Sequence, residues 1–270
     1  MFGTFKGDVS VLDLQSQDVV WTGEGMHSSV VNTVDGCGGI GGGAGAREIA
    51  SASRDGTAKV WDVRQRGPVV TLEPSSTGIE CWSVAFGNAY SPTDRNLVVG
   101  YANGDTKMLD LRTMKIAWET NVGAGVCHVS FDRKDIQMNK LCVSSLGGKV
   151  HVFDLRTFNV QSGFANTVEQ VCKSTVWGCY PLPQDRELSM VTTGDGSLYM
   201  YRYEYPAVRS EVDDTGLARG VAGKLKCVTT SENTSTQPIV SFDWSCEKRG
   251  LFSLTSFDQA VRVGLVLGAS

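Results

Sequence analysis

A glycine-rich run in the first fifth of the chain matches a nucleotide-binding pattern. Residues 36–41, Gly-Cys-Gly-Gly-Ile-Gly, fit GxGxxG, follow the apolar segment 30–34, and precede Asp55 by about twenty residues. That motif needs a helix whose N-terminus faces the pyrophosphate. Residues 42–47 are too glycine-rich and too few to form one. We therefore expect a loop between two strands here, and no nucleotide cofactor.

A second set of residues has the types found in hydrolytic triads. The chain contains three histidines and many serines and aspartates, among them His27, Ser53 and Asp55. No G-x-S-x-G nucleophile elbow occurs, and each histidine falls within a strand or loop of the repeat described below. The sequence therefore predicts no catalytic residues and no enzyme.

Cysteines and charge exclude further classes of site. The eight cysteines form no CxxC pair, and most lie in apolar strand patterns, as Cys142 does, so we expect buried free thiols and no metal. The net charge of −4 argues against nucleic-acid or anionic-membrane binding. No apolar run is long enough to span a bilayer, and the first residues lack a signal-peptide core.

The chemistry-bearing residues lie in a phrase that recurs along the chain. Segments 53–64, 102–112, 146–156 and, more loosely, 194–201 each begin with an Asp/Asn/Gly turn and continue into an alternating strand. Asp55, Asn103, Gly147 and Asp195 mark these turns, each roughly 45 residues after the one before. Repeats of this length that end in an aromatic or apolar residue followed by Asp predict an all-β WD40 β-propeller.

Counting the repeats predicts five full blades plus the end of a sixth. We expect a single domain over residues 1–270, with a partial blade at 1–20 and successive blades at 21–66, 67–114, 115–158, 159–236 and 237–270. The surplus residues between Tyr205 and Pro238 predict an extended hairpin or loop, which could also serve as a contact element.

Four polar and aromatic residues of one repeat occupy the positions of the WD40 structural tetrad. We expect His27, Ser53, Asp55 and Trp61 to form a buried hydrogen-bonded network that satisfies polar groups the blade must bury. This role is structural although the residue types mimic a catalytic site.

Exposed side chains at equivalent repeat positions are the candidates for protein interaction. Trp82 and Trp177 each follow the first apolar residue of a first strand, and alternation turns this position away from the main apolar face. Packing against a neighbouring blade is the alternative. Arg54 and Phe257 precede the turn aspartate of their repeats, and Tyr101 is a further candidate.

Several stretches are more individual than the repeat, and together they carry a family resemblance. They are residues 80–90, 131–140, 173–177, 203–206, 220–223 and 256–263. The chain resembles, over nearly its whole length, the Monad family of WD40 proteins (WD repeat-containing protein 92 type). The resemblance implies a cytoplasmic, non-enzymatic propeller that works with the R2TP and prefoldin-like co-chaperones in axonemal dynein arm preassembly in ciliated cells. The family has also been linked to apoptosis. It has seven blades, so this sequence lacks the first and most of the second.

The resemblance leads to one functional hypothesis, and a motif leads to an alternative. The first is a scaffold that links clients such as axonemal dynein subunits to co-chaperones, with protein partners and no small-molecule substrate. The alternative is a substrate receptor of a cullin-RING ubiquitin ligase. Residues 61–64 form a WDxR sequence that resembles the ligase-adaptor docking motif, with Asp62 and Arg64 as docking residues. Local pairing of Arg64 would equally explain this motif.

Overall fold

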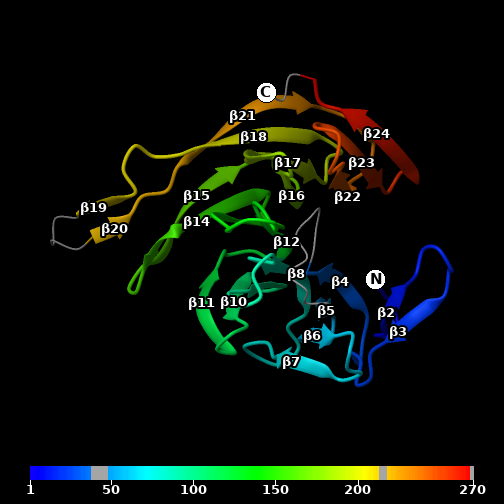
Figure 1. Ribbon diagram of the computed structural model, residues 1–270. Helices are drawn as coiled ribbons and strands as arrows, with labels where there is room; N and C mark the ends of the chain where they lie inside the picture. The colour runs from blue at the N-terminus through cyan, green and yellow to red at the C-terminus, as the bar shows by residue number, and fades with distance from the viewer. Residues whose placement is uncertain (38–47, 213–217, 268–270) are drawn as a thin grey trace. The chain divides into compact units, whose positions relative to one another are not determined.

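Every regular element of the described chain is a β-strand. The computed structural model describes residues 1–37, 48–212 and 218–267, and it contains twenty-four strands and no helix in these ranges (Figure 1). Residues 38–47, which hold most of the GxGxxG motif, lie outside the described part, so the loop expected there stays a prediction. The strands fall into two compact units, one of residues 1–129 and 134–137, the other of residues 130–133 and 138–270.

The first unit contains three antiparallel sheets. The first sheet has the order β1-β2-β3, the second β4-β5-β6-β7 and the third β8-β9-β10-β11. Their bounds are β1 Phe2–Gly3, β2 Val9–Leu12, β3 Val19–Thr22, β4 Val31–Gly36, β5 Glu48–Ser53, β6 Ala58–Asp62, β7 Pro68–Leu72, β8 Cys81–Gly87, β9 Asn96–Tyr101, β10 Asp105–Asp110 and β11 Lys115–Asn121.

The second unit continues the pattern, and the boundary between the units falls within β12. Its main sheets have the orders β12-β13-β14-β15, β16-β17-β18-β21 and β22-β23-β24. A two-stranded hairpin, β19-β20, extends from the β16–β21 sheet (Figure 1). The bounds are β12 Val126–Phe131, β13 Lys140–Ser145, β14 Lys149–Asn159, β15 Gly163–Gln170, β16 Val176–Leu182, β17 Asp185–Thr193, β18 Leu198–Glu204, β19 Ser210–Val212, β20 Ala218–Gly220, β21 Lys224–Ser231, β22 Ile239–Trp244, β23 Leu251–Ser256 and β24 Ala260–Leu265.

Six blade-type sheets in chain order confirm the all-β WD40 propeller class. Four of them have four strands, and the first and last have three within the described residues. The expected extra hairpin between Tyr205 and Pro238 is present as β19–β20. The blade boundaries and the single-domain assignment stay predictions.

The recurring turns follow directly from the sequence. Gly56, Gly104, Gly148 and Gly196 each follow the turn-marking residue and have positive φ, between 75° and 92°. This backbone region favours glycine because a Cβ clashes there. At Gly196 a Cβ would lie 2.0 Å from the Ser235 carbonyl oxygen. In the last sheet Gln259 adopts φ of 65°, so the chain turns the same way without glycine.

The core lies between the middle strands of neighbouring sheets. All six residues of β9 and of β13 are buried, whereas the outer strands β7 and β15 alternate between half-buried and exposed residues. In the first unit, Ala50 and Val60 of one sheet pack with Phe86 and Leu97 of the next. In the second unit, Met190 and Met200 pack with Phe242, Trp244 and Leu254. Because side chains alternate between the two faces of a strand, these sheets present an apolar face to a neighbouring sheet of the same unit.

Candidate protein-interaction surfaces

In four of the sheets, a β-bulge in the first strand leaves one residue without a partner in the ladder. In β8, Cys81 pairs with Tyr101 and Ser83 with Gly100, so Trp82 has no partner in the ladder. The same shift occurs in β4, β16 and β22, and it leaves Asn32, Trp177 and Val240 unpaired. A bulge re-aims the extra side chain away from the regular pleat. The bulge therefore occurs at the position that alternation predicts to point away from the main apolar face.

The residue before the turn aspartate also has an equivalent place in several sheets. The backbone N–H of Arg54 donates to the carbonyl of Val30 at 2.9 Å, and that of Phe257 donates to the carbonyl of Pro238 at 3.1 Å. Ala102 and Gly194 make the corresponding bonds in other sheets. Each bond joins the end of the second strand to the residue just before the first. Arg54 and Phe257 therefore lie at the same end of their blades as the bulges.

In the first unit, Arg54, Glu80 and Trp82 form one cluster. The Glu80 carboxylate accepts a hydrogen bond from Nε of Arg54 at 2.8 Å and another from the indole N–H of Trp82 at 2.9 Å. The Arg54 side chain is 62% exposed and that of Glu80 is 32% exposed. The cluster offers solvent a cation, an anion and a half-buried aromatic ring. We call it the Trp82 cluster.

In the second unit, Trp177 and Phe257 form a contact of different character. Their rings meet edge to face with centroids 6.4 Å apart. Phe257 is 61% exposed, and the buried indole nitrogen of Trp177 has no acceptor among the described residues. Thr175 lies two residues before Trp177, in the position that Glu80 has relative to Trp82. This Trp177–Phe257 pair is an apolar platform, whereas the Trp82 cluster is charged.

Tyr101, predicted as an interaction residue, is buried and the prediction was wrong. It is 1% exposed, and its hydroxyl lies 3.4 Å from the carbonyl oxygen of Glu73. It ends β9 opposite Cys81, and both side chains belong to the core between two sheets. Burial raises the pKa of its hydroxyl well above the ordinary value. Tyr101 therefore stabilises the core and offers no surface contact.

The histidine network is present, with a serine other than the predicted one. Nδ1 of His27 lies 3.2 Å from the Asp55 carboxylate, and its Nε2 lies 2.8 Å from Oγ of Ser51. Ser51 Oγ also accepts the indole N–H of Trp61 at 2.8 Å. Ser53 was the wrong residue. It lies at the strand end, where its Oγ accepts the backbone N–H of Asp55 at 3.1 Å.

Burial makes this network structural. His27 is 4% exposed, and Ser51 and Trp61 are fully buried. Burial lowers the pKa of His27, although Asp55 opposes this effect. Burial acts to raise the pKa of Asp55, but hydrogen bonds from Thr57 and Ser28 outweigh it and the net pKa is lowered. A serine that solvent cannot reach cannot attack a substrate, so this arrangement resembles a triad without its function.

The Asp-x-Arg endings form local forks. Nε and an Nη atom of Arg64 donate to the two carboxylate oxygens of Asp62 at 2.9 and 2.6 Å. Arg156 and Asp154 repeat the arrangement at 2.8 and 2.6 Å. The hydrogen bonds from Arg64 lower the pKa of Asp62. Asp62 thus already has a bidentate partner, and Arg64 keeps a 75% exposed side chain.

Comparison with known proteins identifies the family. No protein-family model matches the chain. A protein of Chlamydomonas reinhardtii described as dynein axonemal assembly factor 10 is 49% identical over 269 residues, which cover 98% of this chain and 75% of that protein. The chain belongs to this family. The human protein of the same description is 49% identical over 268 residues, covering 98% of this chain and 74% of that protein. The one from Dictyostelium discoideum is 24% identical over 282 residues, covering 97% and 69%.

Similar solved structures show only that the fold is shared. A chain in the crystal structure of the mitotic checkpoint complex matches with a TM-score of 0.74 and 18% identity, covering 98% of this chain and 70% of that one. The computationally designed protein Ika8 matches with a TM-score of 0.66 and 15% identity, covering 98% and 67%.

Two searches of the described part of this family member, for metal-binding side-chain groups and for membrane-spanning helices, found neither. No group of three or more His, Cys, Asp or Glu side chains is placed to hold a metal ion in the described ranges. No helix suited to crossing a membrane occurs there either. All eight cysteines are free, and burial raises the pKa of Cys37 to about 12, which keeps its thiol protonated.

Two residues of these sites, Glu80 and Ser51, were missed from the sequence, and strand alternation alone does not single out either of them. Ser51 and Ser53 lie two positions apart in β5 and share one side of that strand, whereas Glu80 lies just before β8, two positions before the bulge residue Trp82. The register places Ser51 opposite Lys59 and Ile49 opposite Trp61, which makes Ser51 the diagonal neighbour of the indole.

Proposed function

We propose that this chain is a non-catalytic scaffold that binds protein partners during the assembly of axonemal dynein. Membership of the dynein axonemal assembly factor 10 family supports the process. The choice of binding sites is supported by the β-bulges, which leave Trp82 and Trp177 outside the ladder. Arg54 and Phe257 lie at the same ends of their blades as these bulges. Tryptophan and arginine are enriched among residues that dominate interface energies.

The two clusters would contribute differently to binding. The Trp82 cluster can pair with charged groups through Arg54, and its aromatic ring adds apolar area. The Trp177–Phe257 pair supplies exposed aromatic surface. We further propose that dynein chains are the clients of this scaffold and that R2TP and prefoldin-like co-chaperones also bind it. We propose that this complex forms in the cytoplasm.

Affinity capture from ciliated cells tests this proposal. The tagged 270-residue chain would be used as bait, and dynein heavy chains and co-chaperone subunits would be quantified by mass spectrometry. Phe257→Ala and Trp82→Ala should each reduce the captured dynein chains several-fold. Val69→Ala, which truncates an exposed apolar residue of β7, is the matched control and should change nothing.

Two outcomes would contradict the proposal. One is full capture of dynein chains by a folded double variant of Trp82 and Phe257. The other is capture of a ubiquitin-ligase adaptor that is lost on Arg64→Ala, without dynein chains or co-chaperones, which would support the ligase hypothesis instead.

A further inference from the structure

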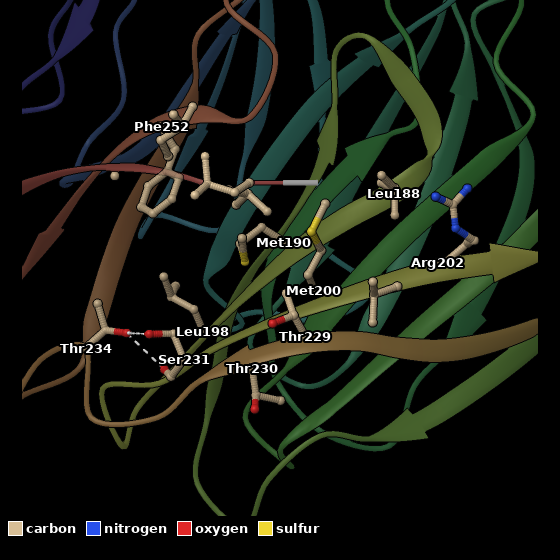
Figure 2. A pocket seen from close by; sticks show the side chains of 15 residues that line it. Leu188, Met190, Leu198, Met200, Arg202, Thr229, Thr230, Ser231, Thr234 and Phe252 are labelled. Atoms are coloured by element: carbon tan, nitrogen blue, oxygen red, sulfur yellow. Dashed lines mark hydrogen bonds between the residues drawn. The ribbon is translucent and has the colours of Figure 1, made fainter. Parts of the chain in front are cut away.

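A pocket in the second unit is lined by core residues and by a paired arginine. It has a volume of about 590 Å³ and is lined from β17, β18, β21, β23 and β24 (Figure 2). Its apolar residues Leu188, Met190 and Met200 belong to the hydrophobic core between two sheets. Arg202, which also lines it, has its guanidinium 3.6 Å from the Glu187 carboxylate. The pocket therefore gives no chemical indication of a ligand, unlike an arginine of the first unit.

Arg54 has a guanidinium that is held at one edge and available at the other. Its Nε–H donates to the Glu80 carboxylate at 2.8 Å, and this is the only hydrogen bond that its side chain makes with the described residues. The outer edge of a guanidinium carries two parallel N–H groups, one on each Nη atom, which match the two oxygens of a carboxylate. In Arg54 these outer donors are available on a side chain that is 62% exposed.

Two other exposed arginines of the first unit direct Nη atoms to carboxylates of the chain itself. Arg64 donates from Nε and from one Nη atom to Asp62, at 2.9 and 2.6 Å. Arg112 has an Nη atom 3.5 Å from the Asp110 carboxylate. The Nη atoms of Arg54 have no such acceptor in the described part of the chain. Exposure alone therefore does not distinguish Arg54, whereas its available outer donors do.

The guanidinium of Arg54 is held beside an aromatic ring. One oxygen of the Glu80 carboxylate accepts Nε–H of Arg54, and the other oxygen accepts the indole N–H of Trp82 at 2.9 Å. A single carboxylate thus joins the cation and the indole. The Trp82 side chain is half-buried, so part of its ring is available to a partner. Arg54 and Trp82 therefore present a charged group and an apolar surface next to each other.

The backbone that carries Trp82 is held from the neighbouring sheet. The side-chain amide of Asn32 in β4 donates to the Cys81 carbonyl at 2.8 Å. The hydroxyl of Thr33, also in β4, donates to the Trp82 carbonyl at 2.7 Å. Groups that are held in place before binding lose less conformational freedom when a partner binds. The bulge at Trp82 is therefore preorganised for binding.

The charges beside Arg54 favour a carboxylate over a phosphate as the partner's group. Glu80 lies on one edge of the guanidinium. Burial acts to raise the pKa of Asp55, the next residue in the chain, but its hydrogen bonds lower the pKa overall, so Asp55 is ionised. A partner carboxylate adds one negative charge here, whereas a phosphate adds about 1.5 to 2. Because Glu80 and Asp55 repel the larger charge more strongly, the carboxylate fits better.

The separation of the guanidinium and the indole indicates how the partner's side chains are spaced. The two groups bind the two oxygens of one carboxylate, so they lie within a few ångströms of that carboxylate on either side. In an extended segment, residues i and i+2 point to the same side and lie about 7 Å apart. An acidic side chain of such a segment can reach Arg54 while an apolar side chain two residues away covers the ring of Trp82.

We propose that the Trp82 cluster binds an extended segment of a partner protein in which an aspartate or glutamate lies two residues from a large apolar residue. The partner's carboxylate pairs with the two outer N–H groups of Arg54, and its apolar side chain packs on the Trp82 indole. Because it names the partner of a surface assigned above, this binding mode rests on the proposed function.

Selection from a phage library of random peptides on the immobilised 270-residue chain tests this binding mode. Wild type, Arg54→Gln and Arg112→Gln are used in parallel, and thermal melting shows that each is folded. Arg112 is the matched control, because its side chain is 65% exposed. Sequences with Asp or Glu two residues from Trp, Phe, Tyr or Leu should be enriched about fivefold or more on wild type and on Arg112→Gln, but not on Arg54→Gln. A wild-type selection that enriches no such sequence would overturn the proposal.

A labelled synthetic peptide from this selection, measured by fluorescence anisotropy, tests the role of the guanidinium. Arg54→Lys keeps the positive charge but lacks the planar pair of donors, so it should weaken binding about fivefold, as should Arg54→Gln. Replacing the peptide's acidic residue with glutamine should weaken binding to the same extent. Equal affinity of wild type and Arg54→Gln would contradict the proposal. Tighter binding of a peptide with phosphoserine at the acidic position would also overturn it.

Capture from ciliated cells separates a failure of this binding mode from a failure of the proposed function. Reduced capture of dynein chains by Trp82→Ala, with full capture by Arg54→Gln, would overturn the acidic segment and leave the scaffold role in place. Full capture by the folded double variant of Trp82 and Phe257 would contradict the proposed function itself, whichever peptides the Trp82 cluster selects.

Discussion

The indole nitrogen of Trp61 lies 2.8 Å from Oγ of Ser51. A serine hydroxyl that accepts the indole N–H is free to donate its own proton to Nε2 of His27, which also lies 2.8 Å away. Nδ1–H of His27 then faces Asp55 and Thr57. This assignment satisfies every buried polar group of the network and requires a neutral imidazole.

Replacing Ser51 with alanine should destabilise the protein more than replacing Ser53. Ser51→Ala leaves the buried indole N–H and the imidazole nitrogen without partners, at a cost of about 1–3 kcal/mol. Ser53→Ala removes weaker bonds at a strand end, including one of 3.4 Å to the Ser29 carbonyl, so its cost should be smaller. Urea denaturation of both variants measures the difference. An equal or larger loss in the Ser53 variant would contradict the assignment of Ser51.

Stability should decrease as the pH falls below about 6.5, the ordinary pKa of histidine. The folded-state pKa of His27 is lowered mainly by burial, so the unfolded chain binds more protons in this range. Stability therefore rises with pH up to about 6.5 and stays constant above it. Urea midpoints between pH 5 and 8 test this.

The matched variant for this pH dependence is His27→Gln, which should flatten the slope. His151 also has a pKa lowered by burial, so a residual slope should persist. A wild-type chain whose stability increases on acidification from pH 7 to 5 would be incompatible with a neutral His27.

Gly196→Ala should destabilise the protein by more than about 1 kcal/mol, because φ of 82° disfavours any Cβ and the Ser235 carbonyl leaves no room for one. Gly67→Ala is the control, since nothing lies within 4 Å of its added Cβ. Thermal unfolding of the two variants gives the comparison. Similar melting temperatures would show that the turn tolerates a side chain.

Tyr101 should respond to substitution as a core residue. Tyr101→Ala creates a cavity in a fully buried position, with an expected cost of about 3–5 kcal/mol, whereas Tyr101→Phe removes only a long hydrogen bond and should cost about 1 kcal/mol or less. Calorimetry measures both. Folded Tyr101→Phe should capture partners like the wild type, and a selective loss of capture would return Tyr101 to the surface candidates.

The sequence predicts the fold well because its determinants are local. Turn residues with positive φ, alternating strands and the repeat length all lie within a few residues of one another, so the six sheets follow from the pattern. The candidate positions Trp82 and Trp177 also follow, because equivalent repeat positions can be aligned without a structure.

Partners across strands could not be predicted in the same way. Which serine meets Trp61 depends on the register that sets Ser51 opposite Lys59. The orientation of Tyr101 depends on the bulge that pairs it with Cys81 and then skips Trp82. A bulge shifts the pairing of two strands by one residue, and the alternation pattern within a single strand does not reveal this shift.

The repeated bulge has a consequence for how such a protein can change. A residue outside the ladder contributes no cross-strand pair, so its type can vary without altering the strand register. This one chain already places an amide, two indoles and an isopropyl group there, at Asn32, Trp82, Trp177 and Val240. Blades that share one backbone framework can therefore present chemically different side chains at this one position.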